Sequence, residues 1–151
     1  MTDDLPARPR LALLMRLLQQ HYAHLVDAAL RDAGFGDIRQ GNAKVLPFVP
    51  AEGISVGEIA VLAGVRKQTM AEAVDQLVRA GYLERRANPH DARSRLIFLT
   101  ERGKAARPIA VTAGDRVEEH WAELTSPEEI ESLRSRLLHL VQQIKQAHPD
   151  L

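Results

Sequence analysis

The hydrophobic pattern of residues 54–104 changes from a helical period to a strand period and back, and few folds accommodate that order. Two helical segments come first, and each of them ends at a glycine, Gly64 and Gly81. Two strand-like runs follow at residues 83–86 and 95–99, and a polar connector with turn-forming residues joins them at residues 88–94. We expect two helices joined by a tight turn and followed by a hairpin, which is a winged helix-turn-helix.

The start of the first helix carries a capping box. The Ser55 hydroxyl can accept from the backbone N–H of Glu58, and the Glu58 carboxylate can reach back to the N–H of Ser55. Ile54 and Ile59 occupy the positions of a hydrophobic staple around this box. At the other end, Gly64 suits the left-handed conformation that closes a helix at low steric cost. A short helix is therefore predicted just before Gly64.

The second helix begins near Val65 or Arg66 and combines a buried stripe with a polar face. Its apolar residues recur at three- and four-residue steps: Met70, Val74, Leu77 and Val78. Its other faces carry charged and amide side chains: Arg66, Lys67, Gln68, Glu72, Asp75 and Arg79. Arg or Lys suits guanine, and Gln suits adenine, in the major groove of DNA. The start of this helix is therefore the predicted edge that enters a DNA groove.

Helices are predicted on both sides of this module. Residues 10–32 form a strong amphipathic pattern, and a weaker helix is expected over residues 37–48. Thr100 is the expected N-cap of a long helix whose apolar stripe reaches Leu124, and a capping box at Ser126 begins the last helix. The predicted fold class is mainly α with a small β-hairpin wing, a winged helix-turn-helix flanked by N- and C-terminal dimerisation helices.

The first helix and the last two carry more apolar surface than a three-helix module with a wing can cover. Pairing these stripes with a second copy of themselves would bury them, so we expect a homodimer held by both chain ends. A monomer with the helices folded back is the alternative. The expected domains are an N-terminal dimerisation helix at 1–36, a DNA-binding lobe at 37–104 and C-terminal dimerisation helices at 105–151.

Charge is distributed unevenly although the net charge is zero. Between Arg66 and Arg107 there are ten Lys or Arg against five Asp or Glu, and from Pro108 on there are four against eight. Phosphates respond to the local patch of charge, so a neutral chain is compatible with DNA binding. The basic segment coincides with the predicted second helix and hairpin.

Several other classes of protein find no support in the sequence. There are no cysteines, which excludes disulfides, thiolate metal sites and thiol redox chemistry. The acidic start and the lack of a long apolar run predict neither signal peptide nor membrane anchor, and hence a cytoplasmic protein. His21 and His24 share a helical face, but no partner ligand is identifiable, so we expect no metal site and no cofactor. No catalytic motif is present, and we expect no enzyme.

Three stretches together resemble the MarR-type transcriptional regulators. They are residues 55–60, residues 63–70 and residues 77–86. The most specific match is the wing, where Asp91 and Arg93 form a D-x-R pattern and residues 99–103 form the L-T-x-x-G start of the next helix. Helix order and length agree over nearly the whole chain. The segment from Ile38 to Ala43 departs from the family's usual pattern.

The resemblance implies a dimer whose two recognition helices enter successive major grooves of a pseudo-palindromic operator, with the wings over the flanking minor grooves. It also implies control of nearby genes, usually repression relieved by a small, often aromatic ligand that binds between the dimerisation helices and the DNA-binding lobe. Tyr22 and Trp121 are candidates to line such a crevice, with core or dimer packing as their alternative role.

The predicted DNA-binding residues fall into two groups. The recognition helix supplies Arg66, Lys67, Gln68, Thr69 and Glu72, and the wing supplies Arg85, Arg86, His90, Asp91, Arg93 and Arg95. Arg93 is the expected minor-groove probe, held by Asp91, while Arg85, Arg86 and Arg95 are expected to meet phosphates. The alternatives are a solvated polar helix face, a partly buried packing role for Thr69 and a surface Asp–Arg pair in the wing.

Two other classes of function remain open at this point. One is a winged-helix module that uses its wing and second helix to bind protein and not DNA. The other is a helical dimer that binds or converts a small molecule independently of DNA. The basic segment gives the second class no support.

Overall fold

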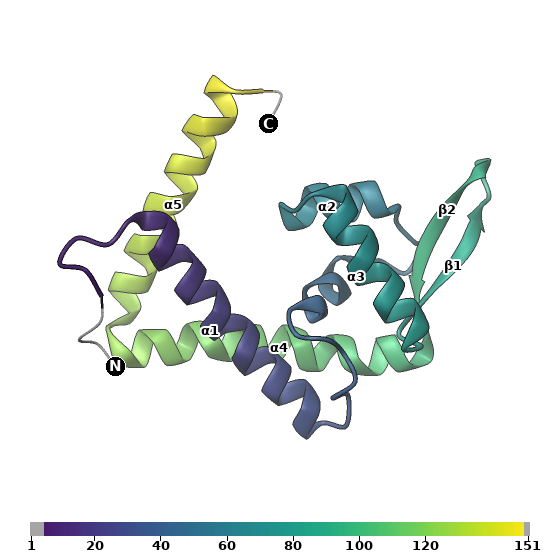
Figure 1. The fold of residues 1–151 in the computed structure, drawn as a ribbon, viewed down its shortest axis with the longest axis horizontal. Helices are drawn as coiled ribbons and strands as arrows, with labels where there is room; N and C mark the ends of the chain where they lie inside the picture. The colour runs from purple at the N-terminus through teal and green to yellow at the C-terminus, as the bar shows by residue number, and fades with distance from the viewer. Residues whose placement is uncertain (1–4, 150–151) are drawn as a thin grey trace. The chain divides into compact units, whose positions relative to one another are not determined.

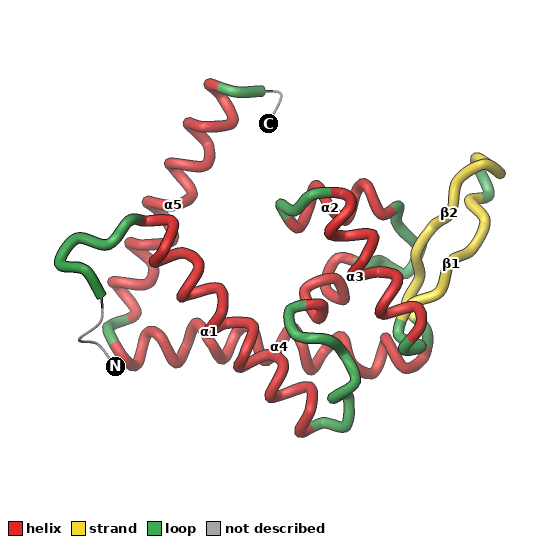
Figure 2. The backbone as a smooth tube through the Cα atoms, in the orientation of Figure 1, coloured by secondary structure: helices red, strands yellow, loops and turns green. Residues whose placement is uncertain are grey.

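The computed structural model describes residues 5–149 and confirms the predicted class, helices with a two-stranded antiparallel hairpin (Figures 1 and 2). The elements are α1 (Leu11–Asp32), the 3₁₀ helix η1 (Asn42–Phe48), α2 (Val56–Ala63), α3 (Lys67–Arg79), β1 (Leu83–Asn88), β2 (Asp91–Leu99), α4 (Glu101–Leu124) and α5 (Pro127–Ala147). The chain divides within α4 into two compact units, one up to Gly114 and one from Asp115. The acidic start at residues 1–4 lies outside the described residues.

The helix-turn-helix forms as its local signals predict. The Ser55 hydroxyl accepts from the N–H of Glu58 at 3.2 Å, and the Glu58 carboxylate accepts from the N–H of Ser55 at 3.0 Å. Ile54 and Ile59 are both buried beside this box. Gly64 follows with φ of +64°, a conformation that costs little without a Cβ. This residue lets the chain turn tightly from α2 into α3.

α3 is the centre of the core of the first unit. Met70, Val74 and Leu77 of its apolar stripe have no exposed surface. The segments around α3 contribute further buried residues, from η1, α2 and the hairpin region: Val45, Leu46, Ile59, Tyr82 and Ile97. Ile97 also exchanges two backbone hydrogen bonds with Ile54, at 2.8 and 3.1 Å, which attaches the base of the hairpin to the start of α2. The orientation of α3 is thus fixed on several sides.

The predicted helix over residues 37–48 is wrong in type and extent. A 3₁₀ helix begins only at Asn42, after a series of turns. Gly41 precedes it with φ of +77°, outside the helical region, and Pro47 within it has no N–H to donate to a helical ladder. A glycine and a proline six residues apart leave too little room for a stable α-helix.

The wing is longer than the sequence predicted. The strands extend to Asn88 and from Asp91, so the expected connector shrinks to two residues. The side chains at both of these ends form the turn, because Asn88 accepts from the N–H of His90 at 2.9 Å and Asp91 accepts from the N–H of Arg93 at 3.0 Å. Residues that read as a polar loop therefore stabilise the tip of a hairpin, which projects beyond the helices of its unit (Figure 1).

The start of α4 is joined to the end of α3 and to the wing. Thr100 caps α4 as predicted, since its hydroxyl accepts from the N–H of Gly103 at 3.1 Å and donates to the carbonyl of Gly81 at 2.6 Å. The N–H of Thr100 donates to the carbonyl of Tyr82 at 3.1 Å. The same carbonyl lies so close to Gly103 that a Cβ there would overlap it. This approach gives a physical reason for the glycine of the L-T-x-x-G pattern.

α5 is an amphipathic helix whose apolar stripe remains exposed. None of its residues is buried. The large hydrophobic side chains with more than a third of their surface exposed include Leu133, Leu137, Leu138, Leu140, Val141 and Ile144. On α1, Leu11, Met15, Leu17 and Leu18 are exposed in the same way. No helix within residues 5–149 is long and apolar enough to cross a membrane.

Replacing Gly103 with Ala should lower the free energy of unfolding by about 1–3 kcal/mol, because the new methyl group would be forced against the Tyr82 carbonyl. Gly57→Ala is the matched control, since a Cβ there meets only the Cε of Lys67, at 3.9 Å. The control should be neutral or stabilising by up to about 1 kcal/mol, from the better helix propensity of Ala. Urea unfolding of both variants measures the difference. Equal effects of the two substitutions would contradict the close approach.

Candidate nucleic-acid interface

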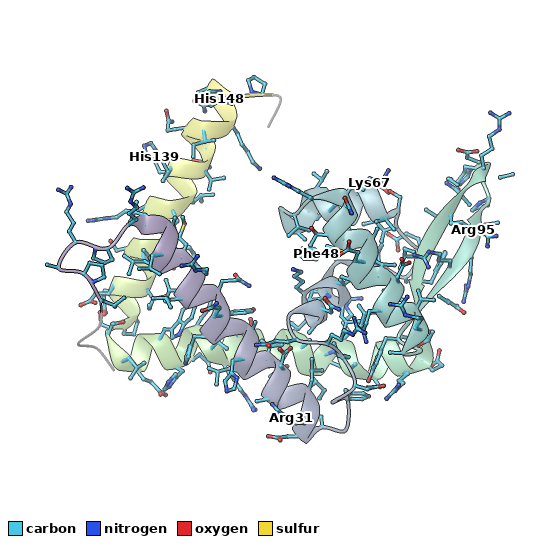
Figure 3. The ribbon with its side chains drawn as sticks, viewed as in Figure 1. Arg31, Phe48, Lys67, Arg95, His139 and His148 are labelled. Atoms are coloured by element: carbon cyan, nitrogen blue, oxygen red, sulfur yellow. The ribbon has the colours of Figure 1, made fainter. Side chains whose placement is uncertain are left out.

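The first turns of α3 present an exposed polar edge. Arg66 is the N-cap, and Lys67, Gln68 and Thr69 follow it in the helix. All four side chains are exposed, as is Glu72 one turn further on. Thr69 is therefore not the packing residue that one interpretation suggested. Figure 3 shows Lys67 at the beginning of α3. The predicted reading edge of the helix is free to meet a partner.

The six predicted wing residues are also exposed, on both strands of the hairpin: Arg85, Arg86, His90, Asp91, Arg93 and Arg95. The register pairs Arg85 with Ile97, Arg86 with Leu96 and Ala87 with Arg95. Side chains of paired residues point to the same face and alternate along a strand. Arg85 and Arg95 therefore share one face of the hairpin, and Arg86 lies on the other. Figure 3 labels Arg95 on the hairpin.

Several of these side chains have partners within the chain. Arg85 forms an ion pair with Asp75, which joins β1 to α3. Arg86 pairs with Glu84, and its guanidinium carbon lies 4.6 Å from the centre of the Phe98 ring. The carboxylate of Asp91 binds the backbone N–H of Arg93 and so shapes the wing tip, whereas the sequence suggested that it holds the Arg93 side chain. The pair of Arg85 and Asp75 links the wing to α3.

A polar cluster centred on Asp37 supports the far end of α3. The Asp37 carboxylate accepts from Arg102 at 2.9 and 3.0 Å and from the hydroxyl of Tyr82. Arg102 also donates to the carbonyl of Ala80 at 2.6 Å, and its guanidinium carbon lies 4.3 Å from the centre of the Tyr82 ring. These contacts join the segment after α1, the end of α3 and the first turn of α4.

Gln76 extends this cluster into the core. It is the one buried polar residue among those the structure describes. Its Nε2 donates to the backbone carbonyl of Asp37 at 3.1 Å, and its Oε1 accepts from the side chain of Asn42 at 3.3 Å. Sequence analysis missed Asp37, Tyr82 and Gln76. The one available signal concerned Gln76, a polar amide beside Leu77 of the buried stripe of α3.

The cluster shifts two pKa values in a consistent way. Hydrogen bonds from Tyr82 and then from Arg102 favour the charged carboxylate and lower the pKa of Asp37. Burial of the Tyr82 phenol and its bond to Asp37 raise the pKa of Tyr82 to about 12. Near neutral pH the carboxylate is charged and the phenol neutral, which is the state that these hydrogen bonds require.

A separate cavity of about 420 Å³ lies beside α1 and η1. Its lining includes Tyr22 and Val26 of α1, Lys44 and Pro47 of η1, and Ala110 of α4. Tyr22 therefore lines a cavity between α1 and η1. Trp121 lines a different hollow, within the second unit. Among the described residues, no group of three or more His, Asp or Glu side chains is placed to hold a metal ion.

Comparison with known proteins finds similarity to one family over part of the chain. Residues 48–94 match the model of the MarR family. No curated protein matches the chain in sequence. Among solved structures, the transcriptional regulator SlyA has a TM-score of 0.76 at 20% identity, covering 90% of this chain and 94% of its own. A structure of MarR has a TM-score of 0.74 at 18% identity, covering 97% and 99%.

One further match includes nucleic acid. It is a cysteine-to-serine variant of MarR from E. coli complexed with operator DNA, 25% identical, covering 86% of this chain and 92% of its own with a TM-score of 0.72. The family match spans α2, α3, β1 and the beginning of β2. The helices on both sides of that segment are included in the structural matches, which confirms the fold over most of the chain.

The Asp37 cluster should give a pH-dependent part of the stability. A carboxyl whose pKa is lower in the folded state contributes stability above its unfolded pKa, ordinarily 3.8, and loses it as pH falls through the folded value. Unfolding free energies measured from pH 2.5 to 7 should therefore decline more steeply in acid for the wild type than for Asp37→Asn. For Tyr82 the sign is opposite, so its contribution lasts up to about pH 10 and is lost toward 12.

The comparison of wild type with Asp37→Asn removes the background from other carboxyls, because those titrate alike in both proteins. Parallel curves in the acid range would show that the carboxylate of Asp37 is not stabilised by the fold.

Proposed function

We propose that this chain is a MarR-type winged-helix regulator that binds operator DNA as a dimer and controls transcription, which its partial family match and its fold support. The observation that carries the proposal is the exposed start of α3 beside a hairpin with four exposed arginines. Base reading needs a helix edge that is polar, exposed and held at a fixed angle, and the α3 edge meets all three conditions.

Within this proposal, the start of α3 reads bases. Gln68 pairs with adenine, and Arg66 and Lys67 bind guanine or phosphate, depending on their depth in the major groove. Thr69 and Glu72 contact the same stretch of DNA from the next positions on that edge. The Asp37 cluster and the pair of Arg85 and Asp75 support this role, since each holds one side of α3.

The wing positions the lobe on the DNA backbone. Arg93 lies where the hairpin register shifts between Ala87 and Asn88, close to the tip. A long cation at a projecting tip suits the negative potential of a narrow minor groove. Arg95 is placed to meet phosphates along the strand, and His90 to meet them at the turn. Arg85 and Arg86 are already paired with Asp75 and Glu84, so their phosphate contacts would be weaker.

The dimer is supported by the exposed stripes of α5 and α1. The row of exposed leucines along one side of α5 is an apolar patch of the kind that marks a protein–protein interface. In a symmetric pair the same stripe serves both copies. Two lobes would then reach two half-sites of a pseudo-palindromic operator. The proposal keeps the DNA-binding lobe at 37–104, the dimerisation helices at the chain ends and the cytoplasmic location expected from the sequence.

We also propose that the regulator is a repressor released by a small ligand. The cavity beside α1 and η1 supports this part, because its volume of about 420 Å³ is in the range of small-molecule sites. A ligand that fits the DNA-incompetent arrangement better than the competent one would shift the population away from DNA.

Gln68→Ala should weaken binding by about 1–3 kcal/mol at particular base pairs and relax preference there, because one base contact is lost. Arg93→Ala should weaken binding to every duplex. Fluorescence anisotropy on the DNA upstream of the protein's own gene, against scrambled DNA of equal length, measures both effects. Arg79→Ala is the control, since it removes a cation from the other end of α3.

Three outcomes separate the competing functions. Tight binding to the upstream DNA that Gln68→Ala and Arg93→Ala weaken, and Arg79→Ala largely spares, supports the regulator. Binding that all three variants leave unchanged favours a winged-helix module for a protein partner. Equal loss from Gln68→Ala on all sequences would contradict its base-reading role.

Leu137→Glu should convert the dimer to a monomer, because it places a charge in the middle of the apolar stripe of α5. Ser135→Glu adds the same charge on the opposite side of the helix and should leave the dimer intact. Analytical ultracentrifugation gives the oligomeric state, and circular dichroism checks that both variants are folded. A wild type that sediments as a monomer at micromolar concentration would remove the dimer from the proposal.

A further inference from the structure

The cavity beside α1 and η1 combines an apolar body with one carboxylate. Most of its exposed lining is apolar, with contributions from Ala23 and Val26 of α1, Ala43 and Pro47 of η1 and the ring of Tyr22. Asp27 is the single acidic residue in this lining. A volume of about 420 Å³ accommodates a molecule built around one aromatic ring.

Asp27 is a half-buried carboxylate with acceptor capacity on the cavity side. Its Oδ2 accepts from the backbone N–H of Gly41 at 3.2 Å, a long hydrogen bond. An ionised carboxylate has about four acceptor sites, so most of its capacity is open to a ligand in the cavity. Burial raises the pKa of Asp27, an effect that the Gly41 N–H, Arg31 and His24 only partly offset. A cation in the cavity would restore the solvation that burial removes.

The basic groups near the cavity are either exposed or outside its lining. Lys44 lines the cavity but is exposed, so it is already solvated by water and gains less from an ionic partner. Arg31 and His24 line a neighbouring hollow that also touches Asp27, and Figure 3 shows Arg31 near the end of α1. The half-buried charge within the cavity is therefore negative.

We propose that this cavity binds a ligand with a ring-sized apolar body and one protonated amine, whose ammonium group pairs with Asp27. The inference rests on the proposed function, because it names the chemical class of the ligand that releases the regulator. Tyr22 and Val26 contact the apolar body, and the amine reaches the end of the cavity formed by Asp27 and Gly41.

The same carboxylate connects the ligand to the recognition helix. The carboxylate that would bind the ammonium also accepts from the N–H of Gly41, the residue that precedes η1. The next residue, Asn42, donates to Gln76 on α3, and Gln76 donates to the carbonyl of Asp37. A shift of Asp27 on ligand binding would therefore reach α3 through Gly41 and these two hydrogen bonds.

Three probes of matched shape test the ligand class: 2-phenylethylamine, 2-phenylethanol and 3-phenylpropanoate. Ligand-observed NMR at pH 7 on the free full-length protein measures their affinities in the millimolar range. The amine should bind roughly tenfold or more tightly than the alcohol, as expected for a charge-assisted hydrogen bond, and more tightly than the carboxylate. In the presence of upstream DNA, the amine should also lower the anisotropy.

Two variants identify the residue responsible. Asp27→Asn keeps an oxygen for the Gly41 N–H but removes the charge, and it should abolish the preference for the amine. Asp27→Glu should retain the preference, and Asp32→Asn, which removes the same charge from an exposed position of α1 outside the cavity lining, should leave it unchanged. Thermal unfolding confirms that each variant is folded. Carboxylate binding as tight as that of the amine, no detectable amine binding, or a preference that survives Asp27→Asn would each overturn the inference.

Separate measurements test the ligand class and the proposed function. Specific DNA binding without ligand tests the regulator alone, and the NMR titration contains no DNA. A protein that binds its upstream DNA but not the amine retains its function and loses the ligand class. A protein that binds the amine through Asp27 but not DNA shows the reverse.

Discussion

The carboxylate of Asp37 joins three parts of the first unit at one point. Arg102 from α4 and Tyr82 from the start of the wing bind it, and Gln76 of α3 binds its backbone carbonyl. A helix edge can read bases only if its angle is set by the rest of the fold, because a misplaced side chain cannot make two hydrogen bonds to one base. The cluster contacts the far end of α3, and the start of that helix is the part proposed to meet DNA.

An ion pair also joins α3 to the wing. Arg85 of β1 pairs with Asp75, the residue next to Gln76 on the helix. Ile54 and Ile97 attach the same hairpin to the start of α2 through backbone hydrogen bonds. Polar contacts thus join the same helices and hairpin that share the apolar core.

Local signals predicted local structure, and long-range partners escaped them. The capping box at Ser55 and the N-cap at Thr100 depend on residues three positions away, and both formed as expected. Asp37 lies 45 residues from Tyr82 and 65 from Arg102, so no pattern within the sequence joins them. The exposure of the predicted α3 and wing residues agrees with the sequence. Their contacts with DNA remain proposals, since exposure alone assigns no partner.

Ion pairs within the chain reduce the positive charge that the basic segment, residues 66–107, can offer to phosphates. Of the ten Lys and Arg between Arg66 and Arg107, four pair with carboxylates of the chain: Arg85, Arg86, Arg102 and Lys104. A cation that already neutralises an acid displaces fewer counterions from DNA, and each displaced counterion adds to the slope of log affinity against log salt. Under the proposed function, the salt dependence of each lobe would therefore come mainly from the remaining six. Binding would then depend less on bulk electrostatics, and more on contacts with bases, than the count of ten cations suggests.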